Sequence, residues 1–346
     1  MQARWITVVA VLAGLSALPV RAQDERAGAH VEVPVREVIL SNGTRRYAVL
    51  MTAGGTAIEA GLDTGSVGLR LLERAAGGMQ IEATPRGTTY SYGIGTRFRG
   101  VAAETTLAFD ALSGPVPLQI IQKIDCRPDK PACPAAHADP ANFGIQGDGL
   151  PGAGFVAIFG INMGEDEIAN PLVKLGVKRW LIELPKPGDT APGKLILNPT
   201  AAETTGFIMF PIIRGLGDSD TGAHDAIDGC LRDLKTQKTI CGALMLDTGA
   251  PGIRVVSADR EKPWAEGDPA QLILLKDGKP ALWDAFTVGR REQASHFATE
   301  DDPQKRVPHL YTGLMPYFLF DVLYDPQHGE IGLRSRSESV IPPPAP

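Results

Sequence analysis

Two aspartates lie in matching stretches of this sequence. Residues 62–72 read Leu-Asp-Thr-Gly-Ser-Val-Gly-Leu-Arg-Leu-Leu, and residues 246–256 read Leu-Asp-Thr-Gly-Ala-Pro-Gly-Ile-Arg-Val-Val. Six of the eleven positions are identical, and four more are similar in character. One copy falls in each half of the chain, and the spacing is far too long for a solenoid. The repeat therefore predicts a duplication into two related lobes.

Asp63 and Asp247 each stand at the end of an apolar strand pattern. A buried carboxylate is costly there unless it is paired or hydrogen-bonded. The glycine two residues later, Gly65 or Gly249, lets the backbone turn tightly and approach another chain closely. If the two loops face each other, the carboxyl groups cannot both ionise at close range, so their pKa values are driven apart. Such a pair supplies one acid and one base from identical residues.

A third Asp-Thr-Gly, at residues 220–222, has a different context. It follows the polar loop 217–219, and no apolar run leads into it or follows it. We interpret Asp220 as part of a turn. The tripeptide alone is therefore weak evidence, and the strand on each side of it carries the argument.

The rest of the chain predicts a β protein. Short apolar or alternating runs are separated by turn residues, and the chain contains 39 Gly and 28 Pro, as is typical of turn-rich β folds. A cap residue followed by proline at 170–171 predicts a short helix. The segment 134–154 reads as a long loop with no visible chemistry. The strands are predicted at 31–40, 46–52, 56–62, 193–198, 207–213, 240–246 and 271–275.

The first 22 residues read as an export signal. Arg4 precedes a short apolar run, and residues 20–22 resemble a small-residue cleavage site; the alternative is an uncleaved membrane anchor. Cleavage would change the formal charge from −6 to −8. A mildly acidic chain without a basic block argues against nucleic acid as a partner. We expect an exported protein, periplasmic or secreted, with no stable membrane insertion after signal removal.

The four cysteines fit an oxidising compartment. Cys126 and Cys133 are close in sequence, as are Cys230 and Cys241, so two local disulfides are the simplest pairing. Three connectivities remain open to four cysteines. A zinc site with His137 lacks a second Cys/His pair at suitable spacing, and we expect no metal and no cofactor.

In its motifs and their order, the chain resembles the pepsin family of aspartic endopeptidases. Both Asp-Thr-Gly motifs, at 63–65 and 247–249, stand at the places where that family has its catalytic motifs. The run 46–66 looks like that family's opening hairpin, and residues 89–96 (Thr-Tyr-Ser-Tyr-Gly-Ile-Gly-Thr) look like its flap. Residues 157–161 and 311–313 are similar to the segments behind the two catalytic loops, and 323–333 to the closing strands. The resemblance covers nearly all of the mature sequence and implies an all-β, bilobal fold with a cleft between the lobes.

The resemblance also implies roles for single residues. Asp63 and Asp247 would hold a water, Thr64 and Thr248 would lock the loops together, and Ser66 would donate its hydroxyl to Asp63. Tyr92, followed by Gly93, would close the flap over the substrate. The implied domains are a signal at 1–22, an N-terminal lobe at 23–200 and a C-terminal lobe at 201–346.

Three features depart from the family pattern. Ala250 stands where a Ser or Thr usually follows the second Asp-Thr-Gly, although retroviral-type relatives also have Ala there. Arg70 replaces the usual tryptophan near the first active-site strand, and the segment between Asp63 and Tyr92 is short. These departures concern the shape of the substrate pockets.

The resemblance favours a monomeric aspartic endopeptidase, a bacterial member of the family, acting on polypeptides. The alternative is a catalytically silent fold of the same type that binds a protein or a glycan. Such relatives usually lose one catalytic aspartate, and this chain has both. A glycosidase with two carboxylates and a serine hydrolase, for which no Gly-x-Ser-x-Gly elbow appears, have less support.

Overall fold

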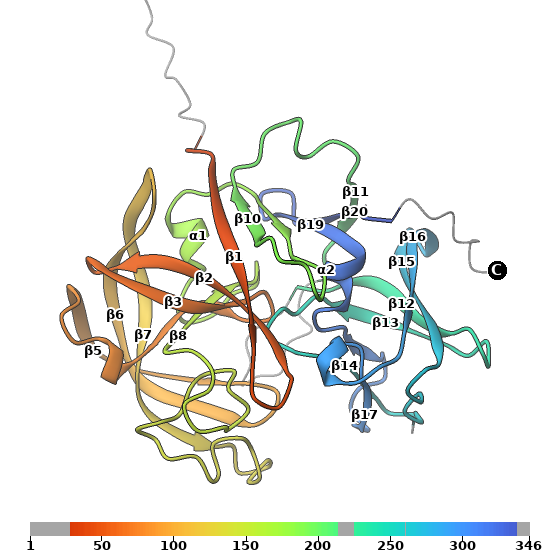
Figure 1. Cartoon of the computed structure of the whole chain (residues 1–346), viewed down its shortest axis with the longest axis horizontal. Coiled ribbons are helices and arrows are strands. Elements are labelled where there is room, and N and C mark those ends of the chain that lie inside the picture. Colours follow the sequence, from red (N-terminus) through yellow and green to blue (C-terminus); the bar gives the residue numbers. More distant parts are fainter. Residues whose placement is uncertain (1–27, 214–224, 260, 338–346) are drawn as a thin grey trace, which may run out of the picture.

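The computed structural model describes residues 28–213, 225–259 and 261–337. Its described residues are almost entirely β, with two short helices, α1 (Pro171–Lys174) and α2 (Met315–Leu319). The predicted all-β, bilobal class is confirmed. Figure 1 shows the early strands on one side of the molecule and the strands of the second half on the other, with the last two strands between them. The signal segment and Asp220 lie outside the described residues.

The larger sheet contains thirteen strands. An additional pairing between β2 and β6 closes a ring of strands in the first half of the chain. In the order of the sheet, its strands are β11 (Ile208–Pro211), β20 (Glu330–Ser335), β19 (Phe320–Asp325), β9 (Trp180–Glu183), β10 (Gly193–Leu197), β1 (Val31–Ile39), β2 (Arg45–Ala53), β3 (Thr56–Asp63), β8 (Ala157–Ile161), β4 (Val67–Leu72), β7 (Leu112–Cys126), β6 (Thr96–Phe109) and β5 (Ile81–Ser91).

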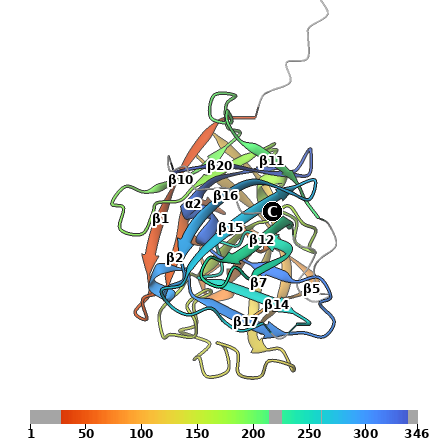
Figure 2. The ribbon, with the colours of Figure 1, turned by 90° about the vertical axis from the view of Figure 1, so that its right-hand side faces the viewer.

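The second sheet contains seven strands, all from the second half of the chain. Figure 2 shows them from the side on which they lie. Their order is β16 (Lys279–Thr287), β15 (Pro269–Lys276), β12 (Ile227–Asp233), β13 (Thr239–Met245), β18 (His309–Tyr311), β14 (Ile253–Ser257) and β17 (Phe297–Asp301). The strands β11, β19 and β20 instead join the larger sheet, so both halves of the chain contribute to it. The boundary at 200/201 stays a prediction.

The same topology occurs twice around the repeated motif. In the first half, β8 lies between β3 and β4, parallel to β3 and antiparallel to β4. In the second half, β18 lies between β13 and β14 with the same two directions. The next strand outward is also parallel in both cases, β7 beside β4 and β17 beside β14. The sequence duplication is therefore also a duplication of structure.

Burial explains why these strands read as continuous apolar runs. All six residues of β4 and all five of β8 are buried. The sequence of α1 fits its position, because the Asn170 side chain accepts hydrogen bonds from the amides of Leu172 and Val173 and a proline opens the helix. This confirms the predicted helix start.

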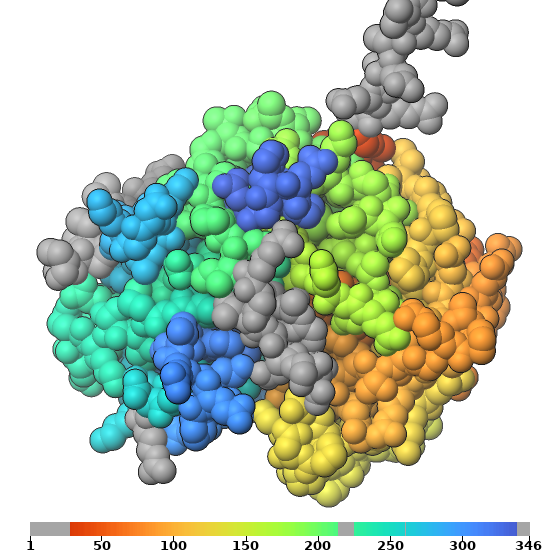
Figure 3. Space-filling view, turned by 180° about the vertical axis from the view of Figure 1, so that it is seen from behind, coloured from red at the N-terminus to blue at the C-terminus, as the bar shows by residue number. Residues whose placement is uncertain are grey.

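Both disulfides are local. Cys126 is bonded to Cys133, at the end of β7, and Cys230 to Cys241, across the β12–β13 pair. Two disulfides are typical of proteins in an oxidising compartment. No helix among the residues described has the length and apolar character needed to cross a membrane. In the space-filling view from behind, the residues of the first half and those of the second half gather on opposite sides of the molecule (Figure 3).

Candidate active site

The two Asp-Thr-Gly loops meet between the lobes. We call residues 63–66 the first Asp loop and residues 247–250 the second Asp loop. A side-chain carbon placed on Gly65 would lie 2.3 Å from Oδ1 of Asp247, and one placed on Gly249 would lie 2.6 Å from Oδ1 of Asp63. Each carboxyl group thus occupies the space that the glycine of the opposite loop leaves open. Only glycine at both positions permits this approach.

The threonines join the loops by reciprocal hydrogen bonds. The Thr64 amide donates to Oγ1 of Thr248 (3.0 Å), and the Thr248 amide donates to Oγ1 of Thr64 (2.9 Å). The hydroxyl groups donate in turn to the carbonyls of Leu246 and Leu62. Both threonines are fully buried. This network fixes the distance between the lobes at the position of the two aspartates.

Each carboxyl group accepts a hydrogen bond from its own loop. The Gly65 amide donates to Oδ1 of Asp63 (2.9 Å), and the Gly249 amide donates to Oδ1 of Asp247 (2.8 Å). Burial raises the pKa of both groups. The charge of Asp63 contributes further at Asp247, whose pKa is raised to about 7. A pair in these surroundings retains one proton well above the usual range for aspartate.

The two aspartates differ in their other neighbours. Oδ2 of Asp63 lies 3.4 Å from Nε2 of Gln146. The hydroxyl of Ser66 is buried and lowers the pKa of Asp63, but it makes no hydrogen bond of standard geometry within the described residues. At the matching place in the second loop, Ala250 offers no hydroxyl. The Ser66 hydroxyl therefore lies near Asp63, but the predicted hydrogen bond between them is not formed with standard geometry.

A hairpin turn covers the first Asp loop. Tyr92 lies between β5 and β6, its amide donates to the carbonyl of Thr96 (2.8 Å), and the Gly95 amide donates back to its carbonyl. The Tyr92 ring packs edge-on against Tyr90 and Phe98. Burial raises the pKa of its hydroxyl, which lies near the Ser66 side chain but makes no hydrogen bond of standard geometry with the described residues. The turn therefore holds Tyr92 and Gly93 over the cleft by backbone bonds and ring packing.

Arg70 takes part in the packing beneath this hairpin. Its guanidinium group lies 3.5 Å from the centre of the Tyr90 ring and bonds Asp166 (3.0 Å). The side chain is buried, with 1% exposed. It supplies a cation where the resemblance implies a tryptophan, and this cation lowers the pKa of Asp63.

The loop at 134–154 carries chemistry that the sequence did not reveal. The expectation that it has none is wrong, because it delivers Gln146 to Asp63 and Asp148 to a buried arginine. Oδ1 of Asp148 lies 2.6 Å from Nη2 of Arg46, whose side chain is only 3% exposed. Arg46 also donates to the carbonyls of Gln146 (2.8 Å) and Gly249 (3.2 Å), so this cation bridges the loop and the second Asp loop.

The sequence contains one weak indication of these contacts between the 134–154 loop and the site. Gln146 and Asp148 both have a positive φ, near 60° and 55°, and they sit among glycines. That composition predicts irregular backbone but does not indicate where its side chains point. The partners are distant in sequence, so a single-sequence pattern could not pair them.

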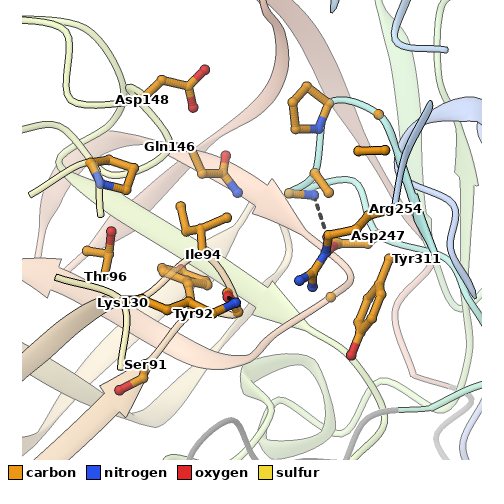
Figure 4. Close-up of a pocket in the computed structure, with 18 of the residues that line it drawn as sticks. Ser91, Tyr92, Ile94, Thr96, Lys130, Gln146, Asp148, Asp247, Arg254 and Tyr311 are labelled. Carbon is orange, nitrogen blue, oxygen red and sulfur yellow. Dashed lines mark hydrogen bonds between the residues drawn. The ribbon is translucent and has the colours of Figure 1, made fainter. Parts of the chain in front are cut away.

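The site residues enclose a cleft of about 640 Å³. Figure 4 shows Asp247 on one wall, with Tyr92, Ile94 and Gln146 opposite. Among the described residues, one group has ligand atoms close enough for a metal ion, and it lies on the surface, outside this cleft: His30, Glu32 and Glu203. His30 bonds Glu203 and Lys194 bonds Glu32, so these groups already have partners.

The structure resembles that of a solved aspartic proteinase. No family model matches the sequence, and no curated protein matches it. Among the solved structures that match is the aspartic proteinase from Irpex lacteus, with a TM-score of 0.60 and 16% sequence identity. The alignment covers 90% of this chain and 99% of that chain. At this identity, the likeness establishes the pepsin-like fold alone.

Proposed function

We propose that this protein is an aspartic endopeptidase that hydrolyses peptide bonds with Asp63 and Asp247. The observation that carries the proposal is the mutual insertion of the two Asp loops, in which each carboxyl group lies against the glycine of the other loop. A fold needs no such pair of costly buried acids for stability alone. The likeness to an aspartic proteinase structure supports the same conclusion.

In this mechanism, a water held between the two carboxyl groups attacks the scissile carbonyl. The ionised carboxylate takes a proton from the water, while the protonated partner donates to the carbonyl oxygen. The proton belongs to the coupled pair rather than to one residue. The raised pKa of Asp247, about 7, keeps that proton in place over much of the acidic range.

The surrounding residues set up this step. Thr64 and Thr248 hold the carboxyl groups at a fixed separation. The hairpin with Tyr92 excludes water from the bound peptide when it closes. An extended peptide with apolar residues beside the cut fits a cleft lined by Phe143, Ile145 and Ile253.

The test is peptide hydrolysis by Asp63→Asn and Asp247→Asn. Asparagine keeps the shape but cannot exchange the proton, so each variant should lose about a thousandfold or more in kcat/KM while remaining folded. Asp220→Asn, in the third Asp-Thr-Gly, is the matched control and should retain activity. Substantial hydrolysis by either of the first two variants would refute the mechanism.

Pepstatin, a transition-state mimic for the pepsin family, gives a second measurement. Inhibition is expected if the cleft is conventional. Cleavage without inhibition would mean altered pockets. The absence of both cleavage and inhibition would favour a catalytically silent fold that binds a protein or a glycan.

A further inference from the structure

Two cations share one carboxylate on the wall of the cleft beside the second Asp loop. Arg254 lies on β14, seven residues after Asp247, and its Nη1 donates to Oε2 of Glu300 on β17 (2.7 Å). Lys130, in the segment after β7, donates to Oε1 of the same Glu300 (3.0 Å). Lys130 also donates to the carbonyl of Gly93 in the flap hairpin (2.8 Å). Figure 4 shows Arg254, Lys130 and Tyr92 around the same space.

This group carries a net positive charge. Burial raises the pKa of Glu300, but the bond from Lys130 and the charge of Arg254 outweigh that effect, so the pKa lies below its ordinary value. Glu300 is therefore ionised and balances only one of the two cations. Among the described residues that line the cleft, positive side chains are also in excess, with six Arg and Lys side chains and four acidic side chains outside the catalytic pair. The complete chain, in contrast, has a formal charge of −6.

Arg254 is also oriented for a ligand. Its guanidinium group lies over the Tyr311 ring, 4.4 Å from the centre, which restrains its plane. Nη2 makes no hydrogen bond with any of the described residues, and a side-chain carbon placed on Gly93 would lie 3.0 Å from it. The flap backbone at Gly93 thus lies against that edge of the guanidinium, with no side chain of its own between them. The Arg254 and Lys130 side chains are 29% and 31% exposed, so a bound peptide can reach both.

We propose that Arg254 and Lys130 form a subsite for the carboxylate of an Asp or Glu side chain in the peptide substrate. This inference rests on the proposed endopeptidase function and names the substrate class. The planar fork of a guanidinium group matches a carboxylate in a bidentate arrangement, and a lysine adds a point charge beside it. The group lies close to the catalytic pair, since the charge of Arg254 also acts on Asp247. The bound acid is therefore within a few residues of the cut.

The experiment compares peptides that differ at one residue. A cleavable apolar peptide with both termini blocked is scanned by replacing one residue at a time with Glu and, as the match, with Gln. At about pH 5.5, where a free Glu side chain is mostly ionised, one position should show a Glu preference of about tenfold in kcat/KM. Arg254→Gln should reduce that preference to within about twofold, and Arg254→Lys should keep part of it.

Arg291→Gln is the matched control. Arg291 lines the same cleft, so this change removes the same unit of charge from the wall without touching the proposed subsite. The Glu preference should survive it. An equal loss of the Glu preference in Arg291→Gln and Arg254→Gln would overturn the proposal. It would mean that the overall positive charge of the cleft, rather than a subsite, attracts the acidic side chain.

Binding separates this inference from the proposed function. Asp63→Asn should bind the Glu peptide about tenfold more tightly than the Gln peptide, and the difference should disappear when Arg254→Gln is added. This result is expected even if the protein hydrolyses nothing. Hydrolysis without any Glu preference at any position refutes the subsite and leaves the endopeptidase in place. A preference for a free terminal carboxylate over the blocked Glu peptide refutes side-chain recognition.

Discussion

The two Asp loops share a backbone but differ in their surroundings. Both follow a strand that pairs in parallel with a later strand, and both place a glycine amide on the aspartate. Asp63 has Gln146, Ser66 and Arg70 near it, all of which belong to the first lobe. Asp247 receives only the Gly249 amide as a hydrogen-bond donor among the described residues. Duplication therefore conserved the geometry that brings two acids together, while the neighbours made the two acids unequal.

The inequality extends to the threonines behind the aspartates. Thr64 and Thr248 are equivalent in the bonds that cross between the loops, but Oγ1 of Thr64 also lies 2.7 Å from the hydroxyl of Tyr317. That hydroxyl lies 2.6 Å from the hydroxyl of Tyr324. Since the Thr64 hydrogen is directed at the Leu246 carbonyl, Tyr317 acts as the donor. The first loop is thus tied to α2 and β19 as well as to the second loop.

The largest expected loss of stability comes from breaking the reciprocal hydrogen bonds between Thr64 and Thr248. Thr248→Val leaves the Thr64 amide and the Leu62 carbonyl buried without partners, which should cost about 2–4 kcal/mol of unfolding free energy. Thr64→Val also removes one of the two hydrogen-bond partners of the Tyr317 hydroxyl, leaving it only Tyr324 among the described residues, and should cost about 1 kcal/mol more. Urea denaturation of both variants measures the difference.

The serine variants are the controls for this comparison. Thr64→Ser and Thr248→Ser keep the hydroxyl group and should each stay within about 1 kcal/mol of the parent protein. Equal costs for the two valine variants would show that the bond to Tyr317 adds nothing, and that the two loops are equivalent behind the aspartates.

An effect of similar size on the unfolding free energy is expected from Arg46, the cation that reaches from the first lobe to the second Asp loop. Arg46→Met leaves Asp148 without its buried partner and should cost about 3 kcal/mol. Removing a cation that lowers the pKa of both carboxyl groups should also raise those pKa values. Activity requires one retained proton, so the upper limb of the profile of kcat/KM against pH should move to higher pH.

Asp148→Asn should shift the upper limb of the pH profile in the opposite direction. It removes a negative charge from the same region and leaves Arg46 in place, so the upper limb should move to lower pH. If both variants shift the limb in one direction, the shift reflects damage to the fold rather than charge, and the electrostatic role of Arg46 is wrong.

The sequence predicted the parts of this molecule that depend on local pattern. The matched runs around Asp63 and Asp247 predicted the duplicated lobes, and short apolar or alternating runs predicted seven of the twenty strands in the described residues. The proline after Asn170 predicted the start of α1. Each of these rests on residues that are adjacent in the chain.

The sequence did not predict the contacts between distant segments. Arg46 and Asp148 are about a hundred residues apart, and only the folded loop brings them together. Arg254 and Lys130 meet only through Glu300. Residues that approach by tertiary folding leave no spacing signal in one sequence, so these contacts could not be predicted.

The smallest expected effect concerns Ala250, which occupies the place that Ser66 holds in the first loop. A hydroxyl donating to Asp247 would favour its charged form and lower its pKa. Ala250→Thr should therefore make the two aspartates more alike. It stabilises the doubly ionised pair, so the last proton is lost at lower pH. The upper limb of kcat/KM should fall by about half a unit to one unit from its position in the parent protein.

The control for this variant is Ala250→Val, which adds the same volume as threonine without the hydroxyl. It should leave the upper limb in place. Burial and the charge of Asp63 raise the pKa of Asp247 to about 7, and valine adds neither a charge nor a hydrogen-bond donor that would change it. A shift common to both variants would assign the effect to bulk in the cleft. A limb that stays in place or rises in Ala250→Thr would mean that the threonine hydroxyl does not reach Asp247, and that the missing hydroxyl is not a source of the inequality between the two loops.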